Sequence, residues 1–115
     1  GGTHTVPTLM KESQISAEIR KFLRDVMHFS VYSTEQGYRK DRGGTRQTPG
    51  IPDLLCFGKG MFFFVEVKTP KGKLRESQEG FSQECAACDP PVPYLVWRDV
   101  RDAFDWLVEI GVISQ

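Results

Sequence analysis

The stretch 50-GIPDLLCFGKGMFFFVEVKTP-70 holds two short apolar runs separated by a turn that contains two glycines. The runs at 51–57 and 61–68 are typical of β-strands, and the Gly-Lys-Gly between them predicts a hairpin. Glu66 and Lys68 interrupt the second run, which is otherwise aromatic and β-branched. Because an unpaired charge inside a sheet costs several kcal/mol, the two charges either pair with each other or form part of a site.

Asp53 favours the explanation that Glu66 and Lys68 form part of a site. If Lys59 and Gly60 form a two-residue loop, Asp53 lies directly opposite Glu66, with their Cβ atoms roughly 5 Å apart on one face. A three-residue loop would turn Asp53 to the other face unless a bulge restored it. Two opposed carboxylates repel each other but suit a hard divalent cation, so we expect Mg²⁺ or Mn²⁺ rather than zinc.

Three helices and two further strands are expected around this hairpin. Apolar spacing predicts a first helix over 11–27, whose buried stripe consists of Ile15, Ile19, Phe22, Leu23 and Val26. The remaining elements are a strand at 29–34, an exposed loop at 35–50, a helix at 75–88, a strand at 94–100 and a closing helix at 101–113. On this last helix the expected inner face is formed by Phe104, Leu107, Val108 and Val112.

The resulting order is αβββαβα, an α/β fold with a small mixed β-sheet flanked by helices. Its 115 residues are expected to form a single domain, residues 1–115, in which residues 1–8 are flexible or derived from a tag. We find no apolar run long enough to span a membrane and no secretory signal. Three cysteines fit a reducing compartment, so a cytoplasmic location is expected.

Charge is distributed unevenly along a chain whose formal net charge is zero. Residues 37–75 carry nine basic and three acidic groups, whereas residues 76–115 carry two basic and eight acidic groups. Such asymmetry can build a basic face on a neutral protein, although solvated loops explain it equally well.

The first helix offers a third carboxylate. At about 100° per residue Glu12 falls within the apolar stripe, whereas Glu18 lies to one side, so Glu12 is the preferred candidate. Glu12 can also be explained as an exposed residue of the first turn that the helix dipole favours.

Three ordered motifs together resemble the VRR-NUC branch of the PD-(D/E)XK nucleases. They are Gly50-Ile51-Pro52-Asp53, then Val65-Glu66-Val67-Lys68-Thr69-Pro70, then Gly72-Lys73-Leu74 with Gln78 four residues on. The resemblance covers nearly the whole chain. Leu74-Arg75-Glu76 lacks the Ser-Pro that usually follows the leucine, and residues 89–93, DPPVP, replace a glycine-containing turn.

The resemblance implies a metal-dependent DNA endonuclease, a phosphodiesterase that selects branched DNA such as four-way junctions or flaps. Asp53, Glu66 and the backbone carbonyl of Val67 would bind the metal, with Glu12 as a direct or water-mediated ligand. Lys68 would orient or activate the attacking water, and Gln78 would position water, phosphate or Lys68. Bacterial or phage DNA processing is the setting that such relatives suggest.

Basic residues on both sides of the site are expected to bind the DNA backbone. They are Arg39, Lys40, Arg42, Arg46, Lys71, Lys73 and Arg75. If both strands are cut, the protein is expected to act as a homodimer. The alternatives are a non-catalytic nucleic-acid-binding module with the same fold and a protein-interaction domain whose Glu66–Lys68 pair is only structural. Cys85 and Cys88 are expected to belong to a packed helix face, and Trp97 and Trp106 to the core.

Overall fold

The computed structural model describes residues 9–34 and 48–115. Its elements follow the expected order: α1 (Glu12–Lys21), which continues into the π-helical turn η1 (Phe22–Val26), then β1 (Ser30–Ser33), β2 (Leu54–Gly58), β3 (Met61–Val67), α2 (Glu76–Ala87), β4 (Tyr94–Trp97) and α3 (Val100–Glu109). The sheet order is β1-β2-β3-β4. The first two pairings are antiparallel and β3 pairs with β4 in parallel, so the sheet is mixed, as predicted.

The hairpin closes as the sequence predicts. Gly58 pairs with Met61, which leaves Lys59 and Gly60 as a two-residue loop. Both loop residues have positive φ, 52° and 76°, the geometry of the turn that matches the twist of paired strands. Leu54 therefore pairs with Val65, and the next position toward the strand ends places Asp53 opposite Glu66.

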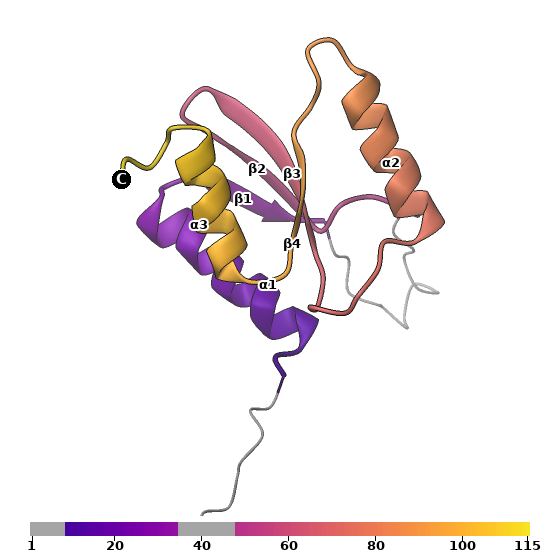
Figure 1. Cartoon of the computed structure of the whole chain (residues 1–115), viewed down its shortest axis with the longest axis horizontal. Helices are drawn as coiled ribbons and strands as arrows, with labels where there is room; N and C mark the ends of the chain where they lie inside the picture. The colour runs from indigo at the N-terminus through magenta and orange to yellow at the C-terminus, as the bar shows by residue number, and fades with distance from the viewer. Residues whose placement is uncertain (1–8, 35–47) are drawn as a thin grey trace, which may run out of the picture.

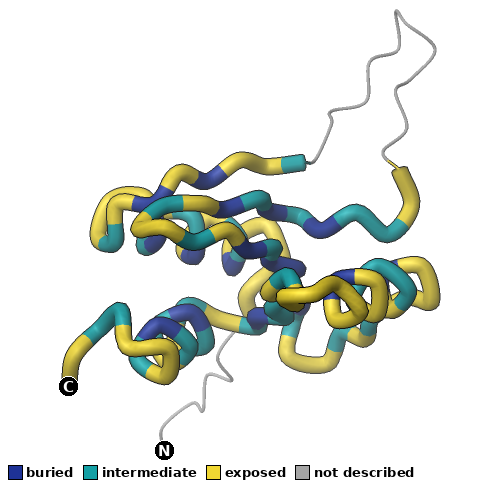
Figure 2. Tube along the Cα trace, turned by 90° about the horizontal axis from the view of Figure 1, so that it is seen from above, coloured by how far each residue is buried: buried dark blue, intermediate teal, exposed yellow. Residues whose placement is uncertain are grey.

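The sheet lies between α1 and α3 on one side and α2 on the other (Figure 1). Phe63, Val65 and Val67 are fully buried on the α1–α3 side, where the rings of Phe63 and Trp106 lie 4.9 Å apart. Buried and more exposed positions alternate along the strands (Figure 2). On the other face of β3, Phe62 is 42% exposed and Glu66 is 2% exposed, so that face is buried only toward the end of the strand.

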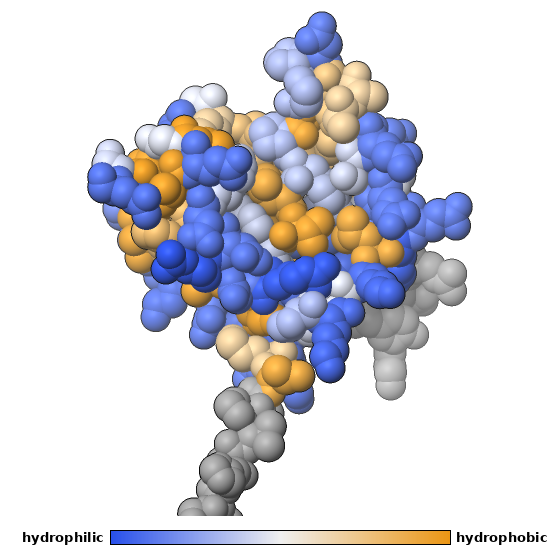
Figure 3. Space-filling view, in the orientation of Figure 1, coloured by the Kyte–Doolittle hydropathy of each residue, from blue (hydrophilic) through white to orange (hydrophobic). Residues whose placement is uncertain are grey.

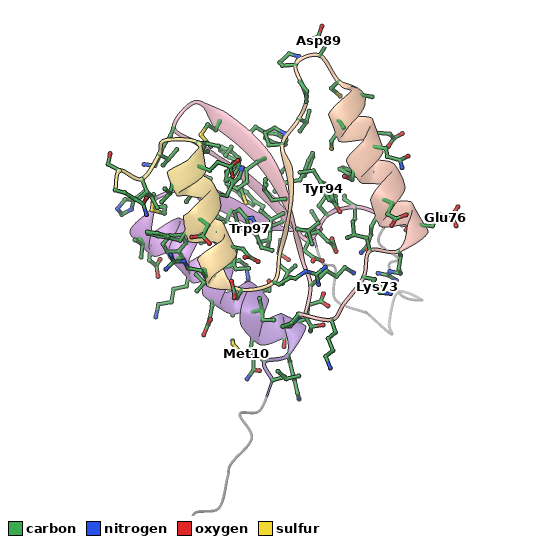
Figure 4. All side chains as sticks on the ribbon, in the orientation of Figure 1. Met10, Lys73, Glu76, Asp89, Tyr94 and Trp97 are labelled. Atoms are coloured by element: carbon green, nitrogen blue, oxygen red, sulfur yellow. The ribbon has the colours of Figure 1, made fainter. Side chains whose placement is uncertain are left out.

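Strand β4 divides its side chains between the two layers. The ring of Tyr94 lies 6.0 Å from that of Phe81 on α2, and the ring of Trp97 lies 6.0 Å from that of Trp106 on α3. Figure 4 shows Tyr94 and Trp97 leaving β4 on opposite sides. The predicted core positions of Trp97 and Trp106 are thus confirmed.

Two helix predictions need correction. Val26 was expected in the buried stripe but is 61% exposed, because the chain widens into a π-helix at Phe22 and the N–H of Met27 donates to the carbonyl of Phe22. The closing helix ends at Glu109 rather than at residue 113, and its buried residues are Ala103 and Leu107. No helix within the described ranges is long and apolar enough to cross a bilayer.

Candidate active site at the end of the hairpin

Asp53 and Glu66 lie opposite each other at the open end of the hairpin, where β2 begins and β3 ends. Asp53 is fixed by the backbone of the neighbouring strand, since its Oδ2 accepts a hydrogen bond of 2.8 Å from the N–H of Val67. Glu66 is 2% exposed and lies on the sheet face that α2 covers. The hairpin register thus brings the two carboxylates to one place.

One carboxamide on α2 holds Glu66. Gln78, which is 4% exposed, donates from Nε2 to Oε1 of Glu66 at 2.9 Å. Its Oε1 accepts from the N–H of Arg75 at 2.8 Å, which satisfies a free donor at the start of α2. Gln78 was expected to position water, phosphate or Lys68; in the structure its two polar atoms position Glu66 and the helix start.

The second oxygen of Glu66, Oε2, is buried without a hydrogen-bond donor among the described residues. Burial first, and then the neighbouring charge of Asp53 and a shared hydrogen bond with it, raise the pKa of Glu66 to about 8. The charge of Lys68 acts in the opposite direction. Near neutral pH the two carboxyl groups therefore require a proton or a cation between them.

Lys68 does not form an ion pair with Glu66. The salt bridge found among the described residues joins Arg101 to Asp105 on the surface of α3. Lys68 is 8% exposed, and its Cδ lies beside Gly72, where an added Cβ would be 3.5 Å away. An ion pair between Glu66 and Lys68 therefore does not explain why both charges lie in this strand.

Two polar cavities adjoin the carboxylates. The serine-lined cavity, of about 320 Å³, is bordered by Glu12, Ser13, Ser16, Ser33, Asp53, Val67 and Arg75. The carboxylate cavity, of about 260 Å³, is bordered by Thr48, Pro49, Gly50, Ile51, Asp53, Glu66, Arg75, Ser77 and Gln78. Asp53 and Arg75 border both, so they mark the boundary between the two spaces.

Asp53 and Glu66 are the side chains that could hold a divalent cation. Glu12 borders the serine-lined cavity, on the other side of Asp53, whereas the exposed Glu18 borders neither cavity. Within the described chain no three acidic, histidine or cysteine side chains come close enough to bind one ion together. The unsatisfied Oε2 of Glu66 fits a cation, with backbone carbonyl and water oxygens completing its coordination.

The predicted DNA-binding residues divide into two groups. Lys71, Lys73 and Arg75 are exposed on the segment between β3 and α2. Hydrophilic side chains cover the outer side of α2 and this segment in Figure 3, and Lys73 is labelled there in Figure 4. Arg39, Lys40, Arg42 and Arg46 lie outside the described residues.

Sequence reasoning missed the serines and Tyr94. Ser16 follows Glu12 by one helical turn, a signal that could have placed it on the same face. The hydroxyl of Tyr94 is buried and has no hydrogen-bond partner in the part of the chain that the structure describes. Burial, followed by the charges of Glu66 and Asp53, raises the pKa of Tyr94. Its position on the site face follows from the parallel pairing of Tyr94 with Phe64, which the sequence does not reveal.

Comparison with known proteins finds similarity in structure but not in sequence families. No family model matches the chain, and no curated protein does. A solved structure titled "VRR_NUC domain" superposes with a TM-score of 0.59 over 87% of this chain and 96% of that one, at 20% sequence identity. The chain therefore has the fold of this VRR_NUC domain, as the three sequence motifs implied.

Proposed function

We propose that this protein is a metal-dependent DNA endonuclease that hydrolyses phosphodiester bonds. The observation that carries the proposal is the pair Asp53–Glu66: the two carboxyl groups lie side by side, and no described residue donates a hydrogen bond to the buried Oε2 of Glu66. Such an arrangement is unfavourable for stability alone, because like charges in a buried place repel. In a fold shared with a VRR_NUC domain, the pair can be explained as the ligands of a catalytic metal ion.

In this proposal Asp53 and Glu66 bind Mg²⁺ or Mn²⁺, with the carbonyl of Val67 as a further ligand. A divalent cation there would polarise the scissile phosphate and lower the pKa of bound water. Gln78 fixes the orientation of Glu66 through its hydrogen bond, and Asp53 is fixed by the N–H of Val67. Glu12, which borders the serine-lined cavity, would act on this cation through a bound water.

Lys68 supplies positive charge close to the carboxylates. The charge of Lys68 lowers the pKa of Glu66, which supports this role. We assign it an electrostatic role, in which it orients the attacking water and offsets negative charge that develops on the phosphate.

The small size of the domain bears on how it would assemble on DNA. A single site cuts one strand, so cutting both strands of a junction or duplex requires two copies, and a symmetric homodimer supplies them. Lys71 and Lys73, exposed beside the site, are proposed to contact the DNA backbone without reading sequence.

The test is cleavage of a labelled four-way junction, a flap and a linear duplex in Mn²⁺, Mg²⁺ or EDTA. We expect cation-dependent cutting, preferentially of branched DNA, and its loss in Glu66→Gln and Lys68→Ala. Cutting at full rate in either variant would reject the assignment. A non-catalytic binding module would bind the junction but show no carboxylate-dependent affinity for Mn²⁺.

A further inference from the structure

Arg75 is the basic residue that borders both cavities. The serine-lined cavity and the carboxylate cavity share only Asp53 and Arg75 among their described lining residues. Lys68, to which the sequence resemblance assigns the positive charge of the site, borders neither. The cation that faces the accessible space beside Asp53 is therefore Arg75.

The backbone of Arg75 is held in a fixed relation to the carboxylates. Its N–H donates to Oε1 of Gln78 at 2.8 Å, and Nε2 of the same carboxamide donates to Glu66 at 2.9 Å. One side chain thus connects the start of α2 to the proposed metal ligand. A movement of the Arg75 backbone relative to Glu66 would break one of these two hydrogen bonds, so the position of the Arg75 backbone beside the site is fixed.

Among the residues that the structure describes, none forms a hydrogen bond or an ion pair with the guanidinium of Arg75. Arg75 is exposed, and it forms no ion pair with a described residue, since the salt bridge found there is that of Arg101 with Asp105. An arginine cannot accept the hydrogen bonds that a serine or aspartate would accept at the start of a helix. Its presence at this position therefore has no capping explanation.

We propose that the Arg75 guanidinium contacts the scissile phosphate and stabilises the charge that develops on its non-bridging oxygens. During hydrolysis the attacking water forms a bond to phosphorus and gives up a proton, while the bond to the leaving oxygen breaks and that oxygen takes up a proton. A planar guanidinium donates two parallel N–H groups to such oxygens, which a lysine ammonium does not. This inference rests on the proposed nuclease function and names a catalytic residue for it.

The decisive comparison is between Arg75→Gln and the matched surface control Arg101→Gln. We expect kcat on a labelled four-way junction to fall about 100-fold or more in Arg75→Gln, the scale of losing one charge-stabilising donor. The affinity for Mn²⁺, measured by calorimetry without DNA, should stay within twofold of wild type. Arg75→Lys should restore part of kcat, free guanidinium should partly restore Arg75→Ala, and Arg101→Gln should cleave like wild type.

Three results would overturn the inference. If Arg75→Gln raises only KM and lowers the slope of log affinity against log salt by about one, Arg75 is a backbone contact. If Mn²⁺ affinity falls together with kcat, its role is structural. If wild-type protein does not cleave DNA in Mn²⁺ or Mg²⁺, the proposed function fails and this inference fails with it, whereas cleavage by wild type that Arg75→Gln retains would remove the inference alone.

Discussion

Replacing Glu66 by glutamine should stabilise the metal-free protein, and the gain should grow with pH. Burial and the neighbouring Asp53 raise the pKa of Glu66 from 4.5 to about 8 in the folded state. Because the folded state holds this proton more tightly than the unfolded chain, the stability that it contributes is complete below pH 4.5. It is lost as the pH rises to about 8.

The size of the effect follows from the shift. One pKa unit corresponds to about 1.4 kcal/mol, so the loss between pH 4.5 and pH 8 is at most roughly 5 kcal/mol. In Glu66→Gln the new amide keeps an oxygen for Gln78 and turns a donor toward Asp53, so it removes the repulsion without leaving an unpaired group. We expect equal stability near pH 4.5 and an advantage of about 2–4 kcal/mol for the variant at pH 8.5.

The assay is urea unfolding in EDTA from pH 4.5 to pH 8.5, followed by the fluorescence of the core residues Trp97 and Trp106. Taking the difference between variant and wild type removes the contributions of titrating groups that do not interact with Glu66. Saturating Mn²⁺ should stabilise wild type, by about 3 kcal/mol at 100 times the dissociation constant, and leave the variant unaffected. Glu109→Gln, at an exposed position of α3, serves as the control. A variant less stable than wild type at pH 8.5, or a difference that does not change with pH, would refute the reasoning.

Three other predictions concern the framework of the site and the burial of the cysteines. Gly50 has a φ of +87° and an added Cβ would lie 2.4 Å from the carbonyl oxygen of Ser77, so Gly50→Ala should lower the free energy of unfolding by about 2–4 kcal/mol. The control Gly80→Ala, a helical position with open space around the new Cβ, should raise it by about 0.5–1 kcal/mol; equal effects in urea unfolding would contradict this. Gln78→Leu should weaken Mn²⁺ binding about 10- to 100-fold in calorimetry, since it removes the group that orients Glu66, and unchanged affinity would argue against that role. One thiol, Cys88, should react quickly with a thiol reagent in the native protein and all three in denaturant; rapid reaction of a second thiol would show that the buried cysteines are accessible.

The hairpin and its carboxylates could be predicted from the sequence because the contacts involved are local. A two-residue loop fixes the register of the strands on either side, and the register places Asp53 across from Glu66. The helix that carries Gln78 was also placed within one residue at each end. These features depend on neighbours in the chain and on strand geometry, which a sequence pattern specifies.

Other features depend on how distant elements pack and were not predictable. The π-helical turn at Phe22 changes the phase of the helix, so Val26 leaves the buried stripe that regular spacing predicted. The approach of α1 to β1 brings Ser13, Ser16 and Ser33 to one cavity, although the sequence separates them by up to twenty positions. The same holds for Arg75, whose position between two cavities depends on the path of the chain from β3 to α2.

A crystal soaked in saturating Mn²⁺ and measured at a wavelength where manganese scatters anomalously tests the metal site most directly. A peak is expected between the Asp53 carboxylate and Oε2 of Glu66, at about 2.0–2.3 Å from each oxygen, and absent from Glu66→Gln crystals soaked in the same way. An empty place between the two carboxylates in the wild-type crystal, or manganese bound only elsewhere on the molecule, would contradict it.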